Sequence, residues 1–146
     1  MSTGASTRPA DPGRRAAIAA TLTGINLAVI GVGAVHILVW NPLSKVPGLS
    51  LDAIYERMRL AGEGELAGKF VADWAVFWGV FSLAYLLVYL LPITVGFLST
   101  KRMTALGLLM VGLTSLGSWW AGFNMGMSLA DTFLTGISGR AARYRP

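Results

Sequence analysis

Hydrophobic residues in this chain are concentrated in three long uncharged stretches, which cover residues 16–44, 74–100 and 103–130. A transmembrane helix needs about 20 consecutive, mostly apolar residues, so each stretch is long enough to cross a bilayer. The pattern therefore predicts an all-α integral membrane protein with three transmembrane helices, at about residues 16–40, 70–98 and 104–130.

A different pattern occupies the connection between the first two spans. Leu51, Ile54, Tyr55 and Met58 recur at positions i, i+3, i+4 and i+7 with charged residues between them, which predicts a short amphipathic helix. Ser50 is placed to cap the start of this helix. We expect the helix to lie on the membrane surface or to pack against the ends of the spans; docking a partner protein is the alternative.

The regions outside the spans are short. Residues 1–15 are rich in Ser, Thr, Pro, Gly and Ala, end in two arginines, and are predicted to form a disordered basic tail. Residues 16–137 then form a single three-helix membrane domain, in which Asn41-Pro42 stops the first helix and Pro92 kinks the second. Residues 122–137 are compatible with a span, a re-entrant segment or a surface helix, and residues 138–146 form a basic tail.

Composition and charge narrow the function classes. The chain has 146 residues, a 54% hydrophobic content, a formal charge of +5 and no cysteine, which excludes disulfides and thiolate chemistry. The basic residues flank the spans and form no stripe with exposed aromatic residues, so nucleic-acid binding is not expected. Because Arg14 and Arg15 abut the first span, we expect a multi-pass protein of the cell (inner) membrane with a cytoplasmic N-terminus.

The second span carries an unusual number of aromatic rings. Rings four residues apart lie on one face of a helix, and a single seam with another span covers only part of this face. We therefore predict that this face contacts a partner protein. The predicted partner interface comprises Trp74, Phe77, Trp78, Phe81, Tyr85 and Tyr89.

Small residues recur at every fourth position on the other two spans. The rows comprise Ala20, Gly24 and Ala28 on the first span, and Thr114, Ser118, Gly122, Gly126 and Ala130 on the third. Small residues let two helix backbones approach closely, which promotes helix association in lipid. We expect spans 1 and 3 to pack through these rows; contact of one row with a second copy or a partner is the alternative.

Polar residues inside a span are costly and are candidates for function. The candidates are Asn26, His36, Asp73, Asn124 and Asp131. We expect Asp73 to pair with Lys69, Asp131 to be solvated, and the asparagines to hydrogen-bond across helices. No Ser or Thr has an evident activating base and no span holds paired carboxylates, so we predict no catalytic residue, no metal ligand and no enzyme activity.

His36 is the only histidine, and we expect it to be a packed or headgroup-level residue. The stretch Ala34–Trp40, in which the histidine precedes Trp40 by four residues, resembles the pigment-ligating stretch of bacterial light-harvesting beta chains. The resemblance implies that His36 binds the magnesium of bacteriochlorophyll and that Trp40 contacts a pigment carbonyl. It covers that stretch alone: those chains have one span, and Asn41-Pro42 replaces their aromatic-Arg-Pro continuation. A haem with two histidine ligands would need a second copy.

These patterns favour a small non-catalytic subunit that packs against other membrane proteins as an accessory, assembly or stabilising component of a larger complex. Its expected partners are membrane lipid and another integral membrane protein or a second copy, and no cofactor is expected. The first alternative is a small homo-oligomeric transporter or channel, with Asn26, Asn124, Thr114 and Ser118 lining its pore. The second is binding of (bacterio)chlorophyll or haem through His36.

Overall fold

Three long helices make up most of the molecule. The computed structural model describes residues 12–91 and 99–141, with side chains up to Leu134. In these residues the elements are α1 (Pro12–Val35), the π-helical turn η1 (His36–Trp40), α2 (Asn41–Lys45), α3 (Leu51–Leu60), α4 (Gly64–Leu90) and α5 (Thr100–Ala141). The segments Pro12–Lys45, Gly64–Leu90 and Thr100–Leu134 are long and apolar enough to cross a membrane. The prediction of an all-α protein with three membrane-spanning helices is confirmed.

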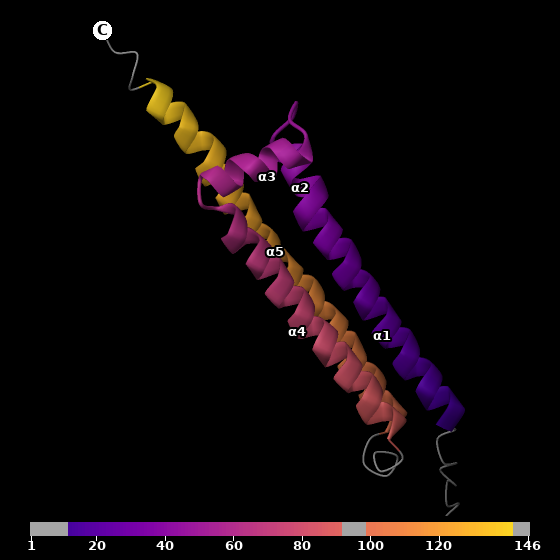
Figure 1. Cartoon of the computed structure of the whole chain (residues 1–146). Helices are drawn as coiled ribbons and strands as arrows, with labels where there is room; N and C mark the ends of the chain where they lie inside the picture. The colour runs from indigo at the N-terminus through magenta and orange to yellow at the C-terminus, as the bar shows by residue number, and fades with distance from the viewer. Residues whose placement is uncertain (1–11, 92–98, 142–146) are drawn as a thin grey trace, which may run out of the picture.

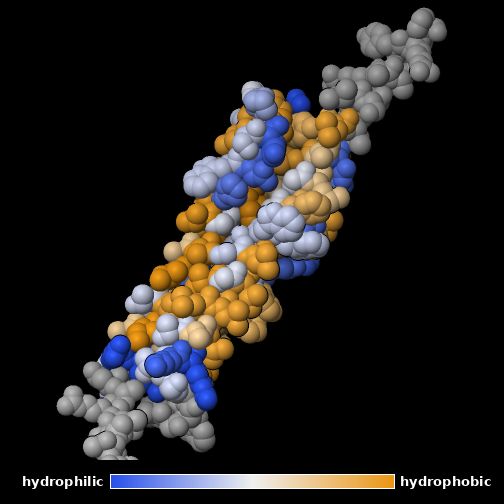
Figure 2. Space-filling view, turned by 180° about the vertical axis from the view of Figure 1, so that it is seen from behind, coloured by the Kyte–Doolittle hydropathy of each residue, from blue (hydrophilic) through white to orange (hydrophobic). Residues whose placement is uncertain are grey.

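The three long helices form an elongated bundle in which each contacts the other two. α1 begins at one end of the bundle, and α5 ends at the other, where α2 and α3 also lie (Figure 1). In the space-filling view, hydrophobic residues cover most of the length, and hydrophilic residues gather toward the two ends (Figure 2). The N-terminal side of α1 and the C-terminal side of α5 are therefore on opposite faces of a membrane that the bundle spans.

Charged and tryptophan side chains indicate where the hydrocarbon layer lies along the helices. On α5, Arg102 and Trp119 are separated by roughly 26 Å of helix at 1.5 Å per residue, close to the thickness of a bilayer's hydrocarbon core, about 30 Å. Arg14 of α1 and the exposed Trp40 of η1 are separated by roughly 39 Å of helix at 1.5 Å per residue, which is long enough to cross the same layer. Tryptophan is enriched at the interface between lipid and water, so Trp40, Trp119 and Trp120 mark the membrane surface opposite the arginines.

Several helix ends differ from the predicted ones. α1 begins at Pro12, so residues 12–15 of the predicted tail are helical, whereas residues 1–11 lie outside the described residues. α4 ends at Leu90, and the predicted kink at Pro92 also falls outside them. α5 continues without a break to Ala141, so residues 122–137 extend the helix and do not re-enter the membrane. The same helix includes residues 138–141 of the predicted basic tail.

The prediction that Asn41-Pro42 stops the first helix is wrong, because a π-helical turn carries the helix through the proline. Proline has no backbone N–H and cannot donate to the carbonyl oxygen one turn earlier, which belongs to Leu38. The hydroxyl of Tyr55 on α3 donates to that oxygen at 2.8 Å. The N–H of Asn41 donates to the carbonyl oxygen of His36, five residues back, as a π turn requires. The helix thus continues to Lys45 and is tied to α3.

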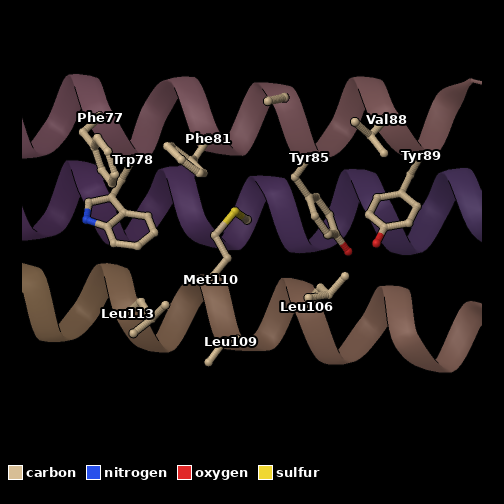
Figure 3. Close-up of a pocket in the computed structure, with 11 residues that line it drawn as sticks. Phe77, Trp78, Phe81, Tyr85, Val88, Tyr89, Leu106, Leu109, Met110 and Leu113 are labelled. Carbon is tan, nitrogen blue, oxygen red and sulfur yellow. The ribbon is translucent and has the colours of Figure 1, made fainter. Parts of the chain in front are cut away.

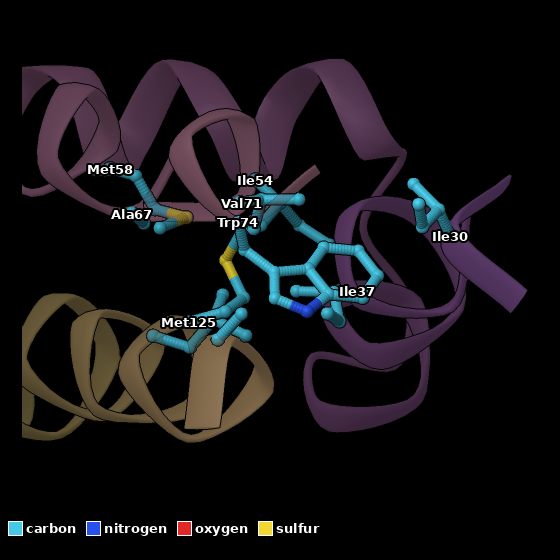
Figure 4. Close-up of a cluster of buried hydrophobic side chains, with 10 residues drawn as sticks. Ile30, Ile37, Ile54, Met58, Ala67, Val71, Trp74 and Met125 are labelled. Carbon is cyan, nitrogen blue, oxygen red and sulfur yellow. The ribbon is translucent and has the colours of Figure 1, made fainter. Parts of the chain in front are cut away.

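A compact apolar core lies where α3 packs on the first turns of α4 and on the C-terminal half of α5 (Figure 4). Ser50 caps α3 by accepting a hydrogen bond from the N–H of Ala53 at 3.3 Å, as predicted. The amphipathic helix is confirmed, and it packs against the ends of the spans. We call this region the cap; its core comprises Ile54 and Met58 of α3, Ala67 and Val71 of α4, and Met125 and Leu129 of α5.

Candidate functional site

A groove of about 480 Å³ runs between α4 and α5 along the membrane-spanning part of the bundle (Figure 3). Phe77 and Phe81 lie on its α4 side, with their ring centroids 4.6 Å apart. Their exposed fractions are 52% and 51%, respectively. The lining is almost entirely apolar. We call it the ring groove; it is lined by Phe77, Trp78, Phe81, Ala84, Tyr85, Val88 and Tyr89 of α4, and by Leu106, Leu109, Met110 and Leu113 of α5.

The six rings predicted to form a partner interface fall into two groups. Trp74 and Tyr89 are buried inside the bundle, and Trp78 and Tyr85 are partly buried. Only Phe77 and Phe81 are largely exposed. The predicted interface is therefore reduced to its central part, because the rings at both ends are covered by the chain itself.

The polar atoms of Trp74 and Tyr85 find partners on the backbone of α5. The indole N–H of Trp74 donates to the carbonyl oxygen of Thr114 at 3.2 Å, and the hydroxyl of Tyr85 donates to that of Met103 at 3.0 Å. A backbone carbonyl of another span therefore satisfies the hydroxyl of Tyr85. Both carbonyls already accept helical hydrogen bonds, but each oxygen has a second lone pair, which the sequence pattern does not reveal.

The two small-residue rows do not meet. Ala20, Gly24 and Ala28 are exposed on α1, and a Cβ atom on Gly24 would find no atom within 4 Å. On α5, Thr114 is fully buried, and the rest of the row, Ser118, Gly122, Gly126 and Ala130, is partly buried. Packing of spans 1 and 3 through both rows is therefore wrong within one chain. α1 instead faces the bundle with Ala19, Leu22, Thr23, Asn26 and Ile30. Contact of the α1 row with a second copy or a partner stays a prediction.

Glycines outside these rows make the closest contacts between helices. A Cβ atom on Gly33 of α1 would lie 2.8 Å from a ring carbon of Trp74, and one on Gly117 of α5 would lie 3.0 Å from the indole nitrogen of the same residue. A Cβ on Gly107 would lie 2.6 Å from the hydroxyl oxygen of Tyr85. These glycines accommodate rings from α4 and not a neighbouring backbone, so a search for rows of small residues overlooks them.

Asn26 links two spans, as predicted, whereas Asn124 does not. The amide nitrogen of Asn26 donates to the hydroxyl of Ser82 on α4 at 2.7 Å, and that hydroxyl donates to the carbonyl oxygen of Trp78. Asn124 donates to the carbonyl of Trp120 in its own helix at 2.9 Å. Asn26 and Thr114, two of the proposed pore-lining residues, are fully buried in helix contacts and do not line an open channel within one chain.

His36 lies at the π-helical turn and is exposed, so of the expected packed or headgroup-level positions the structure favours the second. Its ring meets that of Trp40 edge to face, with centroids 6.1 Å apart. Both the histidine and Asn41 border a second groove, of about 390 Å³, whose other wall includes Trp119 and Phe123 of α5. The imidazole is therefore accessible at the level of the membrane surface, as the headgroup-level alternative expects.

The charged residues of the cap end are placed toward water. Lys69 and Asp73 form the predicted ion pair on the surface of α4, and Asp131 is exposed. On α3, Arg59 donates two hydrogen bonds to the carboxylate of Glu56, and these bonds lower the pKa of Glu56. Burial raises the pKa of Tyr55 on the same helix. α3 therefore presents a polar surface outward and uses its apolar face within the chain.

Comparisons of the chain with protein-family models, curated protein sequences and solved structures find no match. Among the described residues, no group of three or more His, Asp or Glu side chains is placed to hold a metal ion. The ring groove, the surface groove at His36 and the two ends of the bundle are the features on which a function can be based.

Proposed function

We propose that this protein is a small non-catalytic membrane subunit that binds another integral membrane protein as an accessory, assembly or stabilising component of a larger complex. The observation that carries the proposal is the ring groove, in which Phe77 and Phe81 are half exposed beside a wall of leucines from α5. Aromatic side chains supply large contact areas and are enriched where interfaces derive most of their binding energy.

The ring groove is held in shape from both sides. Trp74, one turn before Phe77, is fixed by its hydrogen bond to the carbonyl of Thr114. Tyr85, one turn after Phe81, is fixed by its hydrogen bond to the carbonyl of Met103. Binding to a preformed surface costs less conformational entropy than binding to a mobile one. The exposed phenylalanines are therefore placed for contact before any partner arrives.

The occupant we infer is a transmembrane helix of the partner. From Phe77 to Tyr89 the groove follows roughly 18 Å of α4, about three turns, at 1.5 Å per residue. In lipid, helices associate through close packing and not through hydrophobicity, so a grooved surface of fixed shape is what a partner helix can recognise. Acyl chains of lipid compete for the same groove, and the experiment distinguishes the two occupants.

The test is purification of tagged protein from its native membrane in a mild detergent. We expect a stoichiometric membrane protein to co-purify with the wild type. The double variant Phe77→Leu/Phe81→Leu should lose most of that protein, because leucine keeps the apolar character but not the flat contact surface. Phe123→Leu is the matched control, since this half-exposed ring lies on α5 outside the ring groove.

Circular dichroism should show equal helix content and thermal stability for all the variants, which separates loss of binding from unfolding. A monodisperse wild type that carries only lipid, or a partner retained by the double variant, would contradict the proposal. Release of the partner by Phe123→Leu and not by the double variant would transfer the interface to the other face of α5.

A further inference from the structure

A third groove, of about 580 Å³, lies at the end of the bundle where α1 and α5 begin. It is separate from the ring groove and from the cap. Two exposed cations border it, Arg14 from α1 and Lys101 from α5. We call it the basic groove; its lining comprises Arg14 and Ile18 of α1, and Thr100, Lys101, Thr104, Ala105 and Leu108 of α5.

The lining of the basic groove changes character along the helix axis. Arg14 and Lys101 lie at its outer end. Thr100 is next to Lys101 in sequence, and Thr104 lies about one turn further into the groove. Ile18, one turn further along α1, and Leu108, one turn beyond Thr104 on α5, make its inner end apolar. A phospholipid presents its groups in the same order, with a charged phosphate, then polar ester linkages, then acyl chains.

The electrostatic environment of the basic groove is strongly positive. Arg15 and Arg102 are the immediate neighbours of its two cations in sequence. Among the described residues, the carboxylates all belong to α3, the segment Glu63–Asp73 and Asp131, at the cap end of the molecule. The N-terminus of α5, with its positive helix dipole, lies at the same end as the groove. An anion seated between Arg14 and Lys101 therefore meets no opposing carboxylate from the described chain.

We propose that the basic groove is a binding site for the headgroup of an anionic phospholipid, with the lipid phosphate between Arg14 and Lys101 and an acyl chain against Ile18 and Leu108. Pockets of basic residues between transmembrane helices, at the membrane surface, are suited to such headgroups. The apolar inner end distinguishes this site from one for a free anion, which would gain nothing from contact with Ile18 and Leu108.

The test is native mass spectrometry of the detergent-purified protein with an equimolar mixture of phosphatidylglycerol and phosphatidylcholine. The wild type should retain phosphatidylglycerol in preference. Removal of one basic residue near an anionic lipid surface weakens binding of the lipid by about fivefold. Arg14→Gln and Lys101→Gln should therefore each lower the preference for phosphatidylglycerol by roughly that factor. The double variant should lower it by more. Ala105→Phe fills the groove without changing charge and should lower it as well.

The matched control for the double variant is Lys45→Gln/Lys69→Gln, which removes the same charge at the cap end and should leave the preference unchanged. No preference in the wild type, or an equal loss in the control pair, would overturn the proposal, because the latter would show attraction to overall charge only. Displacement of phosphatidylglycerol by inorganic phosphate, but not by chloride at equal ionic strength, would also overturn it in favour of a free-anion site. None of these three results affects the proposal for the ring groove.

Discussion

The cap and the membrane-spanning part of the bundle are made largely from the same helices but are held together by different contacts. In the cap, Ile54 and Met58 are fully buried while the charged face of α3 is exposed, as the hydrophobic effect requires in water. In the spans, large apolar residues such as Val76 and Leu87 are 65% and 62% exposed. Lipid is as apolar as a leucine side chain, so polarity does not separate the inward face of a span from its lipid-facing side. Shape and hydrogen bonding distinguish the inward face instead.

This difference explains which contacts a residue pattern can predict. The apolar stripe of α3 indicates its buried face directly. The spans are apolar on all sides, so the face that α1 turns inward is distinguished by Thr23 and Asn26, whose side chains reach Ser82 on α4. The small residues of α1, which the pattern makes most conspicuous, point outward.

The largest loss of stability is expected from a substitution in the cap core. Ile54→Ala removes a fully buried side chain where the surrounding helices cannot collapse completely, and should lower the free energy of unfolding by about 2–5 kcal/mol. Leu60→Ala, in the same helix but 72% exposed, should have little effect. Thermal unfolding in detergent, followed by circular dichroism, measures both. Equal losses would show that the cap is not held by burial from water.

A smaller loss is expected where shape specifies the bundle. Gly117→Leu places a side chain against the rings of Trp74 and Trp78, with the first added carbon 3.0 Å from the Trp74 indole nitrogen, and should cost about 1–3 kcal/mol. Gly112→Leu lies on the same helix, where an added Cβ finds no atom within 4 Å, and should be tolerated. Similar melting temperatures for the two variants would mean that close ring packing does not specify the spans.

The smallest loss of stability is expected at the hydrogen bond from Tyr55 of the cap to Leu38 of the first span. Tyr55→Phe removes the hydroxyl that serves the carbonyl oxygen of Leu38, and should cost about 1 kcal/mol at neutral pH. Burial raises the folded-state pKa of Tyr55 above its usual value of about 10. The contribution of this hydroxyl is therefore complete below about pH 10 and is lost as the pH rises through the folded-state pKa. Melting temperatures of the two proteins should differ by a constant amount between neutral pH and pH 9 and converge above pH 10.

Pro42→Ala provides the control for this bond, because alanine restores a backbone N–H that can donate to Leu38. Tyr55→Phe should therefore cost less in the Pro42→Ala background than in the wild type. Additive effects of the two substitutions would argue that the hydroxyl does not compensate for the proline.

Much of the architecture follows from the sequence. The three spans, the amphipathic helix with its Ser50 cap, the Lys69–Asp73 ion pair and the bond from Asn26 to another helix are predicted correctly, because each depends on local spacing or on the high cost of a lone polar group in lipid. The stop at Pro42 is predicted wrongly, because the sequence does not show that Tyr55 lies opposite Leu38.

The candidate sites depend more heavily on the tertiary structure. The ring pattern of α4 is visible in the sequence, but the burial of Trp74 and Tyr89 is set by packing against α1 and α5. The basic groove arises because the helix starts that carry Arg14 and Lys101, far apart in the chain, lie together at one end of the bundle.

The sequence by itself determined that the chain is helical, how many helices cross a membrane and where the polar cap helix lies, since these depend on the length and period of its apolar runs. The tertiary structure decided which face of each span is buried, which glycines accommodate rings, and which side chains from distant segments share a groove. The physical reason is that water selects the buried face of a helix through polarity, which is visible in the sequence. Lipid leaves that selection to packing and to a few hydrogen bonds, which exist only once the helices are assembled.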